Sequence, residues 1–269
     1  MKRTFSIERG RVRESGDGRA CVSVYIQPDD AERKHLLTHY RLDEHTLTSA
    51  LDPDELARIE YEPTHVALII KRPRNYSADE HFLFRVSSYG IFVFKHRLVI
   101  VMSENTPLFD GRFFLKISSI EDIVLGLIYR NIYHFLEHLK IINAVSEALE
   151  RKINASMSNR YLLDLFTLEK SLVFYVSAIN SNGTVIGKLR TSGQKLRLSA
   201  ENMETLEDIS IENAQCLRQS EIYSDILASM MDARASIVNN NLNGLMKTLN
   251  IVTIGIMVPT FVVSAFSMN

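Results

Sequence analysis

The last third of the chain carries a regular stripe of polar, small or flexible side chains. The stripe begins at Asp225 and ends at Ser267, and its members alternate between spacings of four and three residues. The members between these ends are Ser229, Asp232, Ser236, Asn239, Asn243, Met246, Asn250, Thr253, Met257, Thr260 and Ser264. A mean period of 3.5 residues is typical of helices that supercoil around a common axis. We therefore expect one long helix whose polar stripe, here called the seam, faces symmetry mates.

An uncharged run of 22 residues, Thr248–Asn269, coincides with the end of the seam and follows the last charged residue, Lys247. Its length is sufficient to span a bilayer as a helix, although a buried helix of a large soluble core is an alternative. A membrane helix that turns polar groups away from lipid lines a water-filled path, so the pattern predicts ion conduction. Because such a helix would leave the membrane near Asn269, we expect further sequence beyond it.

The N-terminal part alternates between strand and helix patterns. Residues 20–28 predict a strand, Asp29 and Asp30 begin a helix through His39, and Asp43 caps a second short helix. The further strand candidates are His65–Arg72, Phe82–Val86, Gly90–Phe94 and Leu98–Met102, with turns at Tyr89-Gly90 and Lys95–Arg97. This order predicts an α/β arrangement.

The pattern becomes helical from Ser119 onwards. Asn180–Gly183 (NSNG) predicts a turn, and hence a helical hairpin of roughly 158–180 against 184–197. From Ala200 onwards no breaker precedes Gly244, which predicts one helix about 100 Å long at 1.5 Å per residue. The fold class is thus α+β. The expected domains are a cytoplasmic α/β domain at 1–118, a helical region at 119–199, a stalk helix at 200–245 and a transmembrane helix at 246–269.

Composition narrows the function further. A net charge of −1 gives no electrostatic case for a nucleic-acid partner, and two distant cysteines indicate reduced cytosolic thiols. The charged N-terminus has no apolar signal segment, so we expect that part to stay in the cytosol. The pairs His35/His39 and His134/His138 have zinc-ligand spacing, but no carboxylate or cysteine accompanies them at ligand spacing. Without a P-loop or a nucleophile constellation, no enzyme activity is predicted.

The end of the chain resembles the CorA family of magnesium channels. That family has a long stalk helix, a first transmembrane helix with a central proline, and a terminal Tyr-Gly-Met-Asn signature. Here the signature is Phe266-Ser267-Met268-Asn269, in which Met268 and Asn269 match and Ser267 replaces glycine. Residues 162–189 resemble the paired helices beside the family's stalk, and residues 26–55 match loosely.

The resemblance implies a homopentamer in the inner (plasma) membrane, in contact with lipid. Each subunit would have two transmembrane helices, of which the second and a basic cytoplasmic tail would follow residue 269. The first helix would line the pore, with the Met268-Asn269 loop at its outer mouth. Asn269 would form a ring of amide oxygens that contacts the water shell of Mg²⁺, while the Cβ of Ser267 could strain the turn.

The seam supplies the remaining pore candidates. The oxygen-bearing members are Asn243, Asn250, Thr253, Thr260 and Ser264, with Met246 and Met257 as apolar constrictions and Leu249 at a position that narrows the family's pore. Two alternatives are ordinary packing for the methionines and hydrogen bonds to the helix's own i−4 carbonyls for the hydroxyls.

Carboxylates provide the candidate metal sites. Asp225 and Asp232 would each form a ring of five in a cytoplasmic funnel that concentrates divalent cations. Asp208 aligns with a regulatory carboxylate of the family, and Asp79 or Glu80 is the candidate partner on a neighbouring subunit. Solvated surface faces are the alternative. Mg²⁺ would therefore be both substrate and regulatory ligand, since it screens repulsion between acidic faces and holds the channel closed.

The sequence thus predicts a Mg²⁺ channel, with Co²⁺ and Ni²⁺ as further ions. A zinc transporter of the ZntB type is one alternative, because it shares the architecture and carries a different terminal signature. A membrane-anchored sensor that conducts nothing is another.

Overall fold

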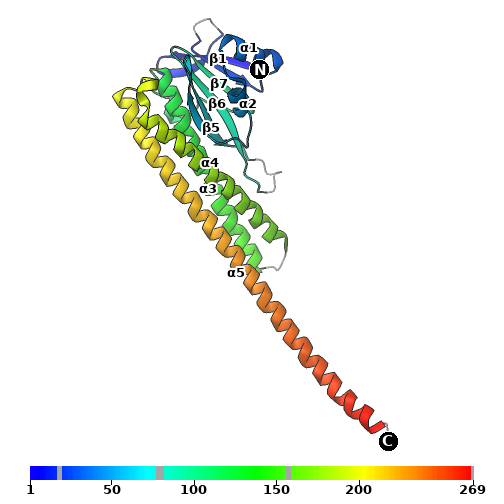
Figure 1. The fold of residues 1–269 in the computed structure, drawn as a ribbon. Helices are drawn as coiled ribbons and strands as arrows, with labels where there is room; N and C mark the ends of the chain where they lie inside the picture. Colours follow the sequence, from blue (N-terminus) through cyan, green and yellow to red (C-terminus); the bar gives the residue numbers. More distant parts are fainter. Residues whose placement is uncertain (17–19, 77–81, 156–158, 268–269) are drawn as a thin grey trace. The chain divides into compact units, whose positions relative to one another are not determined.

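The computed structural model describes residues 1–16, 20–76, 82–155 and 159–267, which form two compact units, Met1–Ser224 and Asp225–Asn269 (Figure 1). In chain order the elements are β1 (Lys2–Glu8), β2 (Arg11–Glu14), β3 (Val22–Ile26), α1 (Asp30–His39), α2 (Glu44–Ser49), β4 (Arg58–Tyr61), β5 (His65–Pro73), β6 (Val86–Phe94), β7 (Leu98–Met102), the 3₁₀ turn η2 (Arg112–Phe114), α3 (Ile120–Ala155), α4 (Asn159–Thr191), the 3₁₀ turn η3 (Gly193–Leu196) and α5 (Ala200–Ser267). The predicted combination of a mixed sheet with long helices is confirmed.

The strands form one mixed sheet in the order β2-β1-β3-β7-β6-β5-β4. Only β3 and β7 pair in parallel, and the other neighbours are antiparallel. The strands expected in residues 20–28, 65–72 and 98–102 are confirmed, whereas the β1–β2 hairpin was not predicted. Arg9 and Gly10 both have positive φ, 49° and 74°, as the two central residues of a type I′ turn require.

The predicted break within β6 is wrong. Val86–Phe94 forms one strand, residues 83–85 lie outside it, and Tyr89-Gly90 is in its middle rather than in a turn. Gly90 is needed for packing, because a Cβ there would lie 2.7 Å from the Cβ of Ala50, the C-cap residue of α2. The second turn is confirmed by the bond from the Phe94 amide to the Arg97 carbonyl, 2.8 Å.

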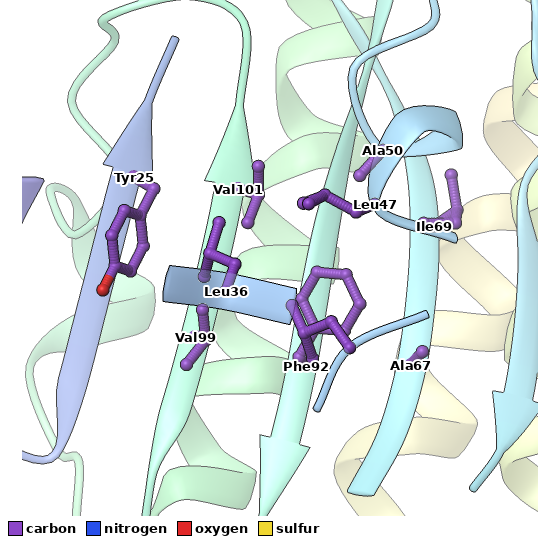
Figure 2. Close-up of a cluster of buried hydrophobic side chains, with 10 residues drawn as sticks. Tyr25, Leu36, Leu47, Ala50, Ala67, Ile69, Phe92, Val99 and Val101 are labelled. Carbon is purple, nitrogen blue, oxygen red and sulfur yellow. The ribbon is translucent and has the colours of Figure 1, made fainter. Parts of the chain in front are cut away.

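Helices α1 and α2 cover one face of the sheet, and Figure 2 shows their side chains over β3, β5, β6 and β7. Asp29 caps α1 in a capping box with Glu32, and Asp43 caps α2 through the Thr46 amide, as expected. The cluster buried between helices and sheet comprises Tyr25, Leu36, Leu42, Leu47, Ala50, Ala67, Ile69, Phe92, Val99 and Val101.

Helices α3 and α4 cover the opposite face of the sheet (Figure 1). The hairpin predicted to turn at Asn180–Gly183 is wrong, because α4 runs without interruption from Asn159 to Thr191. Asn182 is buried, accepts from the Lys71 amide at 2.9 Å and donates to the Lys71 carbonyl at 2.8 Å. Gly183 permits close approach of α5, since an added Cβ would lie 2.9 Å from Nδ2 of Asn213. The polar and small residues therefore serve packing rather than a turn.

The long terminal helix is confirmed as α5, which has 68 residues. At its start Asn202 Nδ2 donates to Asp122 Oδ1 near the beginning of α3, 2.7 Å away, and Asn213 Nδ2 donates to the Ile179 carbonyl of α4 at 3.2 Å. These contacts fix the first part of α5 beside α3 and α4.

Candidate ion-conducting helix

The C-terminal part of α5 has the properties of a membrane span. Leu242–Ser267 has 26 residues, a mean hydropathy of 2.0 and no buried share, and it is the one span candidate among the described residues. At 1.5 Å per residue it measures about 39 Å, which exceeds the roughly 30 Å hydrocarbon core of a bilayer. A helix this apolar without covering side chains requires lipid or further helices around it.

Every predicted seam member from Asn243 to Ser267 lies on this helix and is exposed. The set comprises Asn243, Met246, Asn250, Thr253, Met257, Thr260, Ser264 and Ser267, and Leu249 beside it is also exposed. On a straight helix a 3.5-residue repeat drifts by about 20° per heptad, or about 70° from Asn243 to Ser267. The members therefore share one side of the helix. Met268 and Asn269 lie outside the described residues.

The threonine hydroxyls of the seam donate to carbonyls of their own helix. Thr253 Oγ1 lies 2.8 Å from the Leu249 carbonyl, and Thr260 Oγ1 lies 2.7 Å from the Ile256 carbonyl. These are the i−4 hydrogen bonds expected as an alternative to pore lining. They use the hydroxyl proton only, so each oxygen keeps lone pairs that can accept hydrogen bonds from water.

Pro259 lies within α5 and has no amide proton for the carbonyl of Gly255. Gly255 is two residues after Thr253 and two before Met257, so it lies about 200° from each around the helix. The freed carbonyl is therefore on the side opposite the seam.

The stalk carboxylates are exposed on α5. Asp225 and Asp232 occupy the seam positions that the sequence predicted, within the second unit. Asp208 lies in the first unit, close enough to Tyr129 of α3 to contribute to its raised pKa. Burial is the main cause of that shift, followed by the charges of Glu212 and Asp208. Glu212 was not singled out from the sequence, although its i+4 spacing from Asp208 is a readable signal.

No group of three His, Cys, Asp or Glu residues within the described part of the chain could hold a metal ion. Asp79 and Glu80, the predicted partners of Asp208, fall outside the described residues. Of the pair His134/His138, His138 is part of the core: its Nδ1 lies 2.6 Å from the hydroxyl of buried Tyr175. Burial lowers the pKa of His134 to about 3 and that of His138 to about 4, so both imidazoles are neutral at pH 7.

The family model described as CorA-like Mg2+ transporter protein matches residues 24–269. The chain is 25% identical over 253 residues to the Cobalt/magnesium transport protein CorA of Methanocaldococcus jannaschii, which corresponds to 90% of this chain and 77% of that protein.

Solved structures of other proteins share the fold. The complete structure of the CorA magnesium transporter from Methanocaldococcus jannaschii has a TM-score of 0.78 at 21% identity, covering 100% of this chain and 86% of that one. The ZntB cytoplasmic domain from Vibrio parahaemolyticus has a TM-score of 0.65 at 12% identity, covering 88% of this chain and 98% of that one.

Proposed function

The chain belongs to the CorA-like Mg²⁺ transporter family, and we propose that it conducts hydrated divalent cations through a pore lined by the seam of α5. Mg²⁺ is the first candidate ion, with Co²⁺ and Ni²⁺ next. The observation that carries the proposal is the exposed, apolar Leu242–Ser267 helix with polar oxygens on one side. In a bilayer such oxygens are costly unless they face water or one another.

The threonine geometry suits a hydrated cation. Waters bound to Mg²⁺ direct their hydrogens outward, so a wall that holds the ion with its water shell needs hydrogen-bond acceptors. Thr253 and Thr260 have committed their protons to backbone carbonyls and offer lone pairs. Retaining the water shell avoids the large cost of dehydrating Mg²⁺.

A pore of this kind requires several copies of the chain, and the family resemblance favours five. In a pentamer each seam position becomes a ring. Met246 and Met257 then form apolar constrictions that gate by dewetting, and Leu249 narrows the path beside them. Asp225 and Asp232 form acidic rings that raise the local concentration of divalent cations.

The outer mouth is assigned to Ser267, Met268 and Asn269. The Asn269 amides would contact the water shell, while Ser267 brings a Cβ to a position where the family signature has glycine.

For regulation, Asp208 and either Asp79 or Glu80 of a neighbouring subunit would share a Mg²⁺ ion that keeps the channel closed when cytosolic Mg²⁺ is high. The first unit would lie in the cytoplasm, and α5 would enter the inner (plasma) membrane.

The decisive experiment compares two threonines that have the same local bond. Thr260 is on the seam, whereas Thr248, whose hydroxyl lies 3.0 Å from the Gly244 carbonyl, is on the opposite side of α5. The full-length protein is reconstituted in vesicles that contain a Mg²⁺-sensitive dye. Thr260→Val should reduce the initial rate of Mg²⁺ entry by about tenfold or more, since one lost hydrogen bond of about 1.4 kcal/mol is equivalent to a factor of ten and the variant removes a ring of five hydroxyls. Thr248→Val should retain the wild-type rate.

Other outcomes discriminate the alternatives. Equal rates for the two variants would contradict the seam as pore lining. Zn²⁺ entry without Mg²⁺ entry would support the zinc transporter, and absence of flux for every divalent cation would support a non-conducting anchor. At the mouth, Asn269→Ala should abolish uptake while the circular dichroism spectrum is unchanged.

A further inference from the structure

A cavity of about 610 Å³ lies in the first unit, at the end of β5 and beneath α3. Side chains alternate along a strand, so Arg72 is on the face of β5 that carries Leu68 and Ile70, while Lys71 is on the face covered by α1 and α2. Arg130 and His134 of α3 line the same cavity. Its volume is within the range typical of small-molecule sites.

Arg72 is the unusual member of the lining, because it is a buried cation with only 7% of its surface exposed. It donates to the Thr106 hydroxyl and, at 3.4 Å, from Nε to the Pro73 carbonyl. These bonds use two of the five guanidinium N–H donors. Among the described residues no carboxylate forms an ion pair with Arg72. A buried charge without a counterion is strongly unfavourable, so an anion that enters the cavity would stabilise it.

The other charges around the cavity leave it positive. Arg112 and Arg130 also line it, against the carboxylates of Asp110 and Glu137, so the three arginines exceed the two acids by one charge. Asp110 is already paired with Arg130 at 2.6 Å. Nearby Glu104 is paired with Arg74 at 2.7 Å; its charge acts on Arg72 only from beyond ion-pair distance, so the guanidinium has no carboxylate in contact among the described residues.

Two further groups favour an anion at this position. The Arg112 guanidinium is held over the Tyr133 ring, 4.5 Å from its centroid, and donates to the Tyr133 hydroxyl, which fixes it at the cavity. His134 is neutral, since burial and the positive charges nearby lower its pKa. A neutral imidazole can donate a hydrogen bond without adding to the charge of the site.

We propose that this cavity binds a phosphate group, with Arg72 as the buried anchor and Arg112 as a second contact. The guanidinium fork matches two phosphate oxygens at once, which a lysine ammonium does not. The phosphate is either free inorganic phosphate or the terminal group of a small organic phosphate, for which the cavity has room. The site is separate from the seam and does not depend on the proposed pore.

Titration calorimetry on the full chain in detergent tests the proposal, with inorganic phosphate and AMP as probes up to about 10 mM, a range that detects millimolar Kd values. Magnesium is removed by a chelator so that metal–phosphate complexes do not form. Wild type and the control Arg151→Gln, an exposed arginine on α3, should bind equally. Arg72→Met should weaken binding by about tenfold or more, as expected for loss of a bidentate contact.

Arg112→Gln is the second variant, because Arg112 is exposed and its replacement does not disturb the core. It should also weaken binding, whether or not Arg72→Met folds. Tighter binding of AMP than of phosphate would identify an organic phosphate, and equal binding would identify the free ion; both support the site. Absence of heat with both probes would overturn the proposal. Wild-type affinity in Arg112→Gln would overturn it as well, and so would wild-type affinity in Arg72→Met if that variant folds.

Discussion

Replacing Asn182 by alanine should loosen the attachment of α4 to the sheet. Strand β4 pairs with β5 from Val66 to Ile69, so Lys71 lies beyond the pairing on that side. Asn182 takes the place of the missing strand, because its side chain bonds both the amide and the carbonyl of Lys71. Asn131 of α3 donates to the same carbonyl.

The expected loss follows from these partners. Asn182→Ala leaves the buried Lys71 amide unsatisfied, at about 1–3 kcal/mol, whereas the carbonyl keeps its bond from Asn131. Alanine has a higher helix propensity than asparagine, by up to about 0.7 kcal/mol, which offsets part of the loss. We therefore expect a net destabilisation of about 1–2 kcal/mol. For a unit of this size that lowers the Tm by about 2–8 °C.

Thermal unfolding followed by circular dichroism at the helix band measures this effect in the full chain. Asn180→Ala is the matched control, since Asn180 is exposed on the same helix two residues away and should gain slightly from alanine. Asn131→Ala should cost less than Asn182→Ala, because both Lys71 groups then retain a partner. Equal Tm values for Asn180→Ala and Asn182→Ala would refute the assigned role of Asn182.

Three further predictions concern the first unit. Burial lowers the pKa of His138 to about 4 in the folded protein, whereas the unfolded chain has the ordinary value of about 6.5. The contribution to the free energy of unfolding should therefore be complete above about pH 6.5 and decline as the pH falls towards 4. A decline of equal slope in His138→Gln would contradict this. Gly90→Ala would place a Cβ 2.7 Å from the Cβ of Ala50 and should destabilise the protein by about 1–3 kcal/mol in urea unfolding. Gly187→Ala, at an exposed position of α4, should stabilise it by up to about 1 kcal/mol, and the reverse order of the two would refute the packing argument. Burial raises the pKa of Cys216 to about 12, so mass spectrometry after iodoacetamide treatment should find Cys21 labelled before Cys216 in folded protein, and equal rates would contradict this.

The features that could be predicted are those that depend on local periodicity. Asp29 and Asp43 indicate where α1 and α2 begin, and the 3.5-residue period of the seam indicates α5. Each of these patterns lies within one segment of the chain, so it can be recognised without knowledge of the fold. The errors at Gly90 and Asn182 share another cause. Glycine and asparagine are turn residues, but here they meet a specific partner, Ala50 in one case and the Lys71 backbone in the other. Such partners are distant in sequence, so no local pattern distinguishes the two uses.

The β1–β2 hairpin shows the opposite error. Asparagine, aspartate or glycine is preferred at the first central position of a type I′ turn, and here that position is Arg9. Gly10 alone does not indicate a hairpin. In the candidate site, the sequence predicted that the seam positions from Asn243 to Ser267 lie on one helix, and their role as pore lining stays a prediction. The cavity at Arg72 could not be predicted, because it depends on the packing of α3 against β5.

The internal bonds of Thr253 and Thr260 have one more consequence for the proposed pore. Hydroxyls whose hydrogens are held by the Leu249 and Ile256 carbonyls present only lone pairs to the water of the pore. An anion such as chloride needs hydrogen-bond donors, and these two rings would offer it none. The backbone of the helix would thereby disfavour anions at the two rings, without any charged side chain at that depth.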